Sequence, residues 1–127
     1  MFKESVICIL IITAIFSTNV ITQNFTEKTV EEITQIFIDL KGDILNQDKN
    51  QTEKNLKMLD EKWKGVHEKL AYYIEHDELE KVDTAIVKMK SYVETEDFSS
   101  AIAELDGGKF VIEHIQEKYA LNLKNIF

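Results

Sequence analysis

An uncharged apolar run near the N-terminus constrains this chain more than any other feature. Residues 5–21 read SVICILIITAIFSTNVI and hold 12 apolar side chains with no charged one. A bilayer span needs roughly 20 mostly apolar residues, with about 17 at the lower end. The uncharged extension to Phe25 reaches that length. We therefore expect a membrane anchor over residues 1–25 and a single folded domain over residues 26–127.

A cleaved secretory signal is the alternative for this segment, with Lys3 as its basic head and residues 6–16 as its apolar core. The stretch after Phe16 reads STN and has no A-x-A-like cleavage site, which favours an uncleaved anchor. Cys8 precedes most of the apolar core, so it cannot be the acylated first residue of a mature lipoprotein. The four-residue head suits a cytoplasmic N-terminus, with the bulk of the chain extracytoplasmic.

Composition narrows the class of the remaining domain. The 127 residues include 15 basic residues, all Lys, against 23 acidic ones, a net charge of −8 that argues against nucleic-acid binding. One cysteine excludes an intramolecular disulfide and a cysteine-based zinc site. The absence of proline and the four glycines favour helices over many short strands.

Four segments after the anchor show apolar residues at alternating intervals of three and four, flanked by Lys, Glu and Asp. This spacing is typical of amphipathic helices that bury one face. The links between them are short and polar, which favours antiparallel neighbours. The sequence therefore predicts an all-α fold: a membrane helix followed by an antiparallel bundle of about four helices arranged as two helical hairpins. The four stripes cover residues 30–44, 56–73, 79–93 and 101–119.

The two expected hairpins resemble each other when the chain is shifted by 49 positions. Residues 39–71 then overlie residues 88–120, and Asp48 falls on Asp97. The alignment predicts two hairpins of one design, each turning at an aspartate, whether by duplication or by chance. For helix starts, the spacing of an N-cap and its partner points to Asn50 and to Asp77, and the cap candidates for the last helix are Asp97, Ser99 and Ser100.

Two features of the last segment leave alternatives open. Gly107 and Gly108 lie inside its apolar stripe, where glycine disfavours helix. Either the helix bends or splits there, or Gly108 lets a bulky neighbour such as Trp63 pack against the backbone. Residues 121–127, LNLKNIF, alternate in a way that suits an extended strip. Such an apolar end either docks on its own bundle or is presented to a partner.

The side chains that could carry chemistry are few. His76, Glu78 and His114 could bind a metal ion or another ligand if the fold brought them together. No His-x-x-x-His spacing exists, and His76 equally suits a turn where its ring meets the carbonyl end of a helix. No serine lies in a glycine-rich elbow, and Gly107-Gly108-Lys109 lacks the spacing of a phosphate-binding loop. We therefore predict no enzyme activity, no cofactor and no small-molecule substrate.

Several stretches together resemble one protein family. They read HDELEKVD at residues 76–83, MKSYVETED at 89–97, AIAEL at 101–105, EHI at 113–115 and LNLKNIF at 121–127. With the N-terminal apolar segment and a central Trp63, they are similar to the Firmicute family called domain of unknown function 4363. The resemblance implies a membrane-anchored helical protein of spore-forming bacteria, with no established activity. It also implies a multi-span membrane protein as partner, because an uncharacterised family of that kind is associated with it. Gly107-Gly108 departs from the family's pattern, where helix formers are more typical.

Two functions follow as hypotheses. The first is a non-enzymatic, membrane-anchored, extracytoplasmic scaffold that binds a membrane protein. The second is a ligand- or metal-binding envelope sensor that uses His76, Glu78 and His114.

Overall fold

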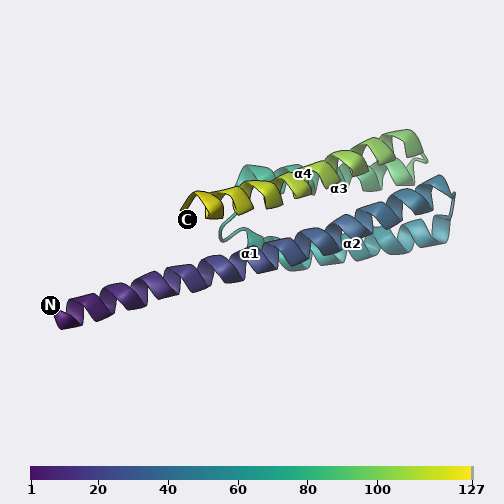
Figure 1. Ribbon diagram of the computed structural model, residues 1–127. Coiled ribbons are helices and arrows are strands. Elements are labelled where there is room, and N and C mark those ends of the chain that lie inside the picture. The colour runs from purple at the N-terminus through teal and green to yellow at the C-terminus, as the bar shows by residue number, and fades with distance from the viewer. Residues whose placement is uncertain (127) are drawn as a thin grey trace.

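Four α-helices form the computed structural model (Figure 1). The structure describes the backbone of residues 1–126 and the side chains of residues 1–120. No strand occurs in that part of the chain, so the all-α prediction is confirmed. The helices are α1 (Phe2–Leu45), α2 (Lys49–Leu70), α3 (His76–Glu94) and α4 (Phe98–Ile126).

The expected anchor and the first bundle helix are one continuous helix. α1 runs for 44 residues, which corresponds to a length of about 66 Å. Neither glycine nor proline occurs between Ile21 and Val30, so nothing in the sequence breaks the helix where burial begins. The threonine hydroxyls there bond to their own helix, as Thr22 Oγ1 donates to Asn19 O at 3.0 Å and Thr26 Oγ1 to Thr22 O at 2.7 Å. The apolar N-terminal segment and the bundle therefore share one helix instead of forming two successive elements.

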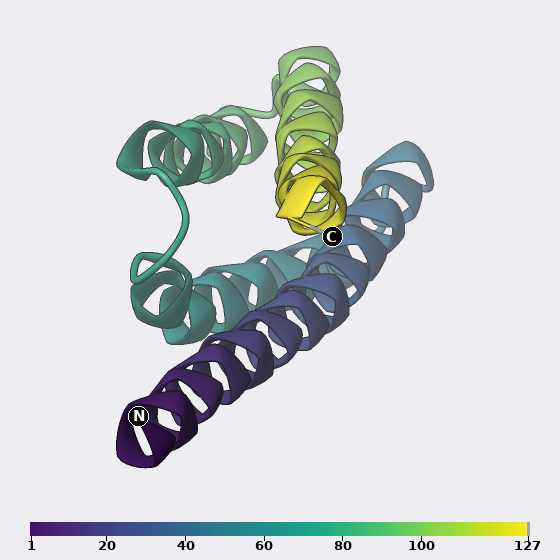
Figure 2. The ribbon, with the colours of Figure 1, turned by 60° about the vertical axis from the view of Figure 1, so that its left-hand side comes forward.

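The helices pair as two antiparallel hairpins, as predicted. α1 packs against both α2 and α4, and α3 packs mainly against α4, whereas α2 and α3 are the least closely packed of the helix pairs in contact. Figure 2 shows the same arrangement, with α1 and α4 adjacent and the backbones of α2 and α3 further apart. The N-terminal part of α1 extends away from the other helices (Figure 1). We call the end of the bundle nearest to this extension the proximal end, and the end with the two hairpin turns the distal end.

The two hairpin turns have the same backbone construction. Gln47 at φ 57° and Glu96 at φ 58° lie 49 residues apart and both adopt the left-handed conformation. Each turn closes with the two hydrogen bonds of a Schellman motif. The amides of Gln47 and Asp48 donate to Ile44 O and Asp43 O at 3.1 and 3.0 Å, and those of Glu96 and Asp97 donate to Val93 O and Tyr92 O at 3.1 and 2.8 Å. The structure thus repeats the 49-residue correspondence seen in the sequence.

The helix starts differ in part from those expected. Asp97 accepts a bond from Ser100 N at 3.3 Å, as predicted for the last helix. For α2 the cap is Asp48, which accepts from Gln51 N at 3.1 Å, and the prediction of Asn50 is wrong. Because the turn closes within three residues, the next helix begins directly after the aspartate. α3 begins at His76 with Glu75 as its N-cap, and Glu75 makes no side-chain cap bond, so the prediction of Asp77 is also wrong.

The apolar stripes form one core that includes Trp63, which is 3% exposed. α4 continues through Gly107 and Gly108 without splitting. A Cβ on Gly108 would lie 3.1 Å from Ala85 Cβ and 3.3 Å from Phe37 Cζ. Gly108 therefore permits close helix packing, but its bulky neighbour is Phe37 on α1 and not Trp63. A Cβ on Gly107 would meet nothing within 4 Å.

The end of α4 corrects a further expectation. The backbone is helical to Ile126, so the extended strip predicted for residues 121–127 is wrong over residues 121–126. Whether that segment docks by its side chains lies outside the described residues.

Candidate functional site

Residues 2–21 of α1 project from the bundle, with most of their side chains exposed to solvent. Side chains from Met1 to Thr18 are exposed, and Ile21 is 66% exposed. α1 is the one helix of the described residues that is long and apolar enough to cross a membrane by length and composition. Burial inside the bundle begins at Thr26, which is 4% exposed. A mostly exposed apolar segment is thus joined directly to a packed domain.

A tyrosine connects α1 to the other helices at the proximal end. Tyr73 Oη lies 2.5 Å from Thr26 Oγ1 and donates to Thr22 O at 3.3 Å. Burial raises the pKa of the Tyr73 phenol, although its hydrogen bond with Thr26 acts in the opposite direction. The Tyr73 ring also meets the Tyr119 ring edge-on, with centroids 6.3 Å apart. This contact links the α2–α3 turn to both α1 and α4.

The rest of the α2–α3 turn, residues 71–75, is fixed in the same way. Glu75 N donates to Tyr119 Oη at 2.9 Å, and the Glu75 carboxylate lies 3.3 Å from Lys118 Nζ. The hydrogen bond with Glu75 raises the pKa of the Lys118 ammonium. Ile74 is buried at 4% exposure, whereas Tyr72 is 90% exposed. We call Tyr72, Tyr73 and Tyr119 the tyrosine collar.

Polar side chains bridge α2 and α3, the least closely packed of the helix pairs in contact. The buried Trp63 donates its Nε1–H to Asp83 Oδ1 at 2.5 Å, and His67 Nε2 lies 3.2 Å from Asp83 Oδ2. Asp60 pairs with Lys90 at 3.3 Å and with Lys64 at 3.0 Å. Hydrogen bonds from Lys64 and Lys90 lower the pKa of Asp60.

Sequence reasoning missed this bridge. A signal for it was present, because Trp63 and His67 are four residues apart and share one helix face. A buried indole N–H usually needs an acceptor, and Asp83 is the acidic residue next to Val82 in the third apolar stripe.

The structure does not gather the three residues considered for a sensor site. His76 is exposed, with Nε2 3.9 Å from Glu80 Oε2. Glu78 is buried and pairs with Lys81 at 3.8 Å and with Lys118 at 3.9 Å. His114 is exposed and stacks on Phe110 with centroids 6.4 Å apart. Within the described residues, no group of three His, Cys, Asp or Glu side chains could hold a metal ion.

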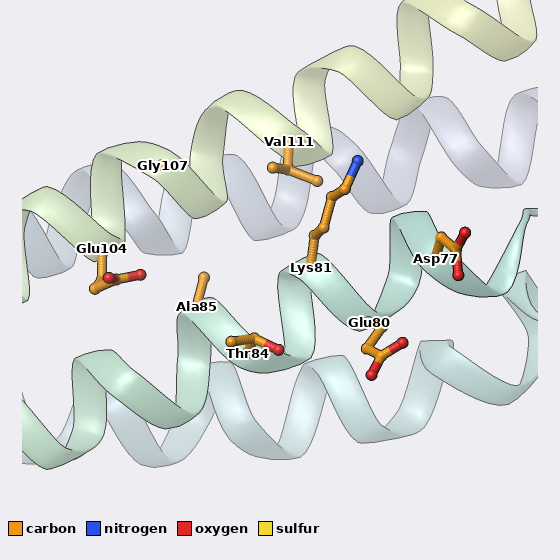
Figure 3. A pocket seen from close by; sticks show the side chains of 8 residues that line it. All are labelled: Asp77, Glu80, Lys81, Thr84, Ala85, Glu104, Gly107 and Val111. Atoms are coloured by element: carbon orange, nitrogen blue, oxygen red, sulfur yellow. The ribbon is translucent and has the colours of Figure 1, made fainter.

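Two of the surface cavities in the described part of the bundle have walls with both polar and apolar groups. The first, of about 580 Å³, lies between α3 and α4. Figure 3 shows Lys81 reaching across it toward Val111, with Glu104 and Gly107 on the α4 side. Its walls carry both signs of charge, with the Lys81 ammonium among the carboxylates of Asp77, Glu80 and Glu104.

The second cavity, of about 740 Å³, lies at the distal end and opens between α2 and α3. We call it the distal groove. Its apolar lining is Ile44, Leu56, Val93 and Phe98, and its charged lining is Lys49, Glu53, Lys57, Asp60, Lys90, Glu94 and Glu96.

Comparison with known proteins identifies the family. The model for the domain of unknown function DUF4363 matches residues 20–126. The chain belongs to this family. The match begins at Val20, so it includes the junction between the exposed segment of α1 and the bundle. No curated protein and no solved structure matches the chain. The resemblance to this family noted in the sequence is thereby confirmed, and the family's description assigns no activity.

Proposed function

We propose that this DUF4363 protein is a single-pass, membrane-anchored, extracytoplasmic bundle that binds a multi-span membrane protein without catalysing a reaction. The observation that carries the proposal is the continuity of α1. One helix supplies both the exposed apolar segment and a helix of the bundle that packs against α2 and α4. A signal sequence that is removed after export has no need to continue into the domain core.

The geometry suits a rigid support. The part of α1 from Thr22 to Leu45 holds 24 residues, which gives the bundle a height of about 36 Å above the apolar segment. The distal groove lies at the top of this height, at the end opposite the collar. A bundle held at a fixed height above the membrane is better placed to bind a membrane protein than a soluble one. The bundle and a membrane protein diffuse in the same plane.

The proposed orientation rests on the basic residues that flank the apolar run. Lys3 lies two residues before the run, whereas the first basic residue after it is Lys28. A lysine close to one end of a span tends to stay in the cytoplasm, which places residues 26–127 outside. The sensor hypothesis gains no support from the geometry, since His76, Glu78 and His114 each have a different neighbour.

The proposal is tested by cross-linking full-length protein in its native membranes, followed by affinity purification. Two matched variants separate the roles of anchor and bundle: one replaces residues 5–21 with an unrelated apolar span, and one joins residues 1–25 to an unrelated helical bundle. We expect a multi-span protein to be recovered with the native chain and with the first variant only. Recovery of no membrane protein, or equal recovery with the second variant, would contradict the proposal.

A second experiment tests the orientation. Protease treatment of intact cells without their wall should digest the bundle. Full protection of the bundle would contradict the proposed extracytoplasmic orientation.

A further inference from the structure

Tyr72 is held almost fully in solvent by a turn whose other residues are fixed. The residue on its C-terminal side, Tyr73, bonds to Thr26 and to the Thr22 carbonyl, and Ile74 is buried. Glu75 bonds to Tyr119 through its amide. The 90% exposure of Tyr72 is therefore a set feature of the turn. A single exposed aromatic side chain is common on protein surfaces, so its position decides its meaning.

Tyr72 lies at the level where the exposed apolar part of α1 ends. Tyr73 Oη is 3.3 Å from the carbonyl oxygen of Thr22, and Ile21 is the last of the exposed large apolar residues in that segment. Figure 1 shows the turn between α2 and α3 beside α1 at this point. From Phe2 to Ile21 the helix spans about 30 Å, the thickness of the hydrocarbon core of a bilayer. If that segment fills the bilayer, Tyr72 reaches the headgroup layer.

The residue types at the proximal end of the bundle are those that favour the headgroup layer of a membrane. Three of the four tyrosines in the chain belong to the collar. Beside it, Lys69 Nζ lies 5.7 Å from the centroid of the Phe25 ring. Tyrosine is enriched where membranes meet water because its ring is apolar and its hydroxyl is polar. Lysine can place its stem along apolar groups and its ammonium at the level of lipid phosphate.

We propose that the proximal end of the bundle is a lipid-binding surface, with the Tyr72 ring in the headgroup layer of the bilayer that α1 crosses. This inference rests on the proposed membrane anchoring. Residues 26–127 carry 14 Lys and 22 acidic side chains, so the sides of the bundle are repelled by anionic lipids. The bundle thus contacts the membrane with its proximal end, where the tyrosine collar lies, and not with its sides.

The test measures the depth of spin labels on the full-length protein in vesicles of phosphatidylethanolamine and phosphatidylglycerol. Because Cys8 is the one cysteine of the chain, Cys8→Ser provides a background for single labels at Tyr72→Cys, Ile12→Cys and Glu96→Cys. Glu96 is the matched exposed turn position at the distal end. Power saturation with oxygen and with a water-soluble nickel complex reports the depth of each label.

We expect the label at position 12 to contact oxygen and little nickel. The label at 72 should show several-fold less contact with nickel than the label at 96. Equal nickel contact at 72 and 96, with position 12 still protected, overturns the lipid surface and leaves the anchoring intact. Nickel contact at position 12 equal to that at 96 overturns both. Protection of 72 in native membranes but not in lipid vesicles would assign this end to a protein partner and overturn the inference.

A second variant, Tyr72→Trp, should show quenching of its tryptophan fluorescence by brominated lipids beyond that of native Trp63. No added quenching contradicts the inference even if the labelled chain folds poorly.

Discussion

At the scale of residues, the bundle depends on a few polar contacts that complete an apolar core. Trp63 is buried on the stripe where its spacing predicted it, but its indole N–H needs an acceptor that the stripe does not supply. Asp83 supplies it from α3, although α2 and α3 are the least closely packed of the helix pairs in contact. The side chains therefore hold together two helices whose backbones remain apart.

Removal of the acceptor should weaken this contact. Asp83→Ala leaves the Trp63 N–H without its partner and also removes the neighbour of His67. We expect a loss of about 1–3 kcal/mol in the free energy of unfolding, measured by denaturation of the full chain in detergent micelles. Asp83→Asn keeps an acceptor oxygen and should lose less. Identical denaturation midpoints for Asp83→Ala and the native chain would show that the bond contributes nothing.

The two adjacent glycines of α4 form a second matched pair. Gly107→Ala adds a methyl group in open space, so it should stabilise the chain by about 1 kcal/mol through helix propensity. Gly108→Ala adds the same group 3.1 Å from Ala85 Cβ and 3.3 Å from the fully buried Phe37 ring, so it should destabilise the chain. Thermal unfolding monitored by circular dichroism compares them. An equal gain in both variants would mean that α1 and α3 are not closely packed against α4.

Acid should remove the contribution of the Asp60 carboxylate to the stability of the folded chain. Hydrogen bonds from Lys64 and Lys90 lower its pKa below the ordinary value of 3.8, so the folded state favours the carboxylate. That stabilisation is complete above the ordinary pKa and is lost as the pH falls through the lower folded value. We expect Asp60→Asn to be less stable than the native chain at pH 6 and to approach it at strongly acidic pH. A stability difference that grows as the pH falls would contradict this reading.

At the scale of elements, the helices could be predicted from sequence because each buries one face at a regular spacing. The 49-residue correspondence also located the two hairpin turns, at Asp48 and Asp97. The junction near residue 25 could not be predicted, because a change in composition from apolar to charged does not require a break in the backbone. The starts of α2 and α3 were missed since a tight turn, and not side-chain capping at the expected residue, decided where each helix began. The site was the least predictable part: Asp83 and the tyrosine collar join residues that are distant in the chain.

The left-handed residues of the two turns offer a test of this construction. Gln47 and Glu96 carry a Cβ in a conformation that glycine adopts without steric strain. Gln47→Gly and Glu96→Gly should each stabilise the chain by up to about 1 kcal/mol, whereas Gln47→Ala should give no gain. Thermal unfolding again provides the measurement. Destabilisation by both glycine variants would mean that these turns do not adopt the left-handed conformation.

At the scale of the whole molecule, α1 determines how the bundle is placed relative to the exposed apolar segment. It is the helix that contacts both α2 and α4, and its N-terminal half is the exposed apolar segment. A packed bundle joined to that segment by an unbroken helix has a fixed height and direction, which a flexible linker would not provide. The proposed binding of a membrane protein and the proposed seating on lipid both depend on this continuity.

The distance between spin labels on either side of the junction tests that continuity most directly. In the Cys8→Ser background, labels at Ile12→Cys and Ile38→Cys occupy exposed positions of α1 that are 26 residues apart. A continuous helix places their backbones about 39 Å apart. In lipid vesicles we expect one narrow distance distribution centred near that value, after allowance for the label side chains. A broad distribution, or one centred at a clearly shorter distance, would show a hinge between the anchor and the bundle and would contradict the account.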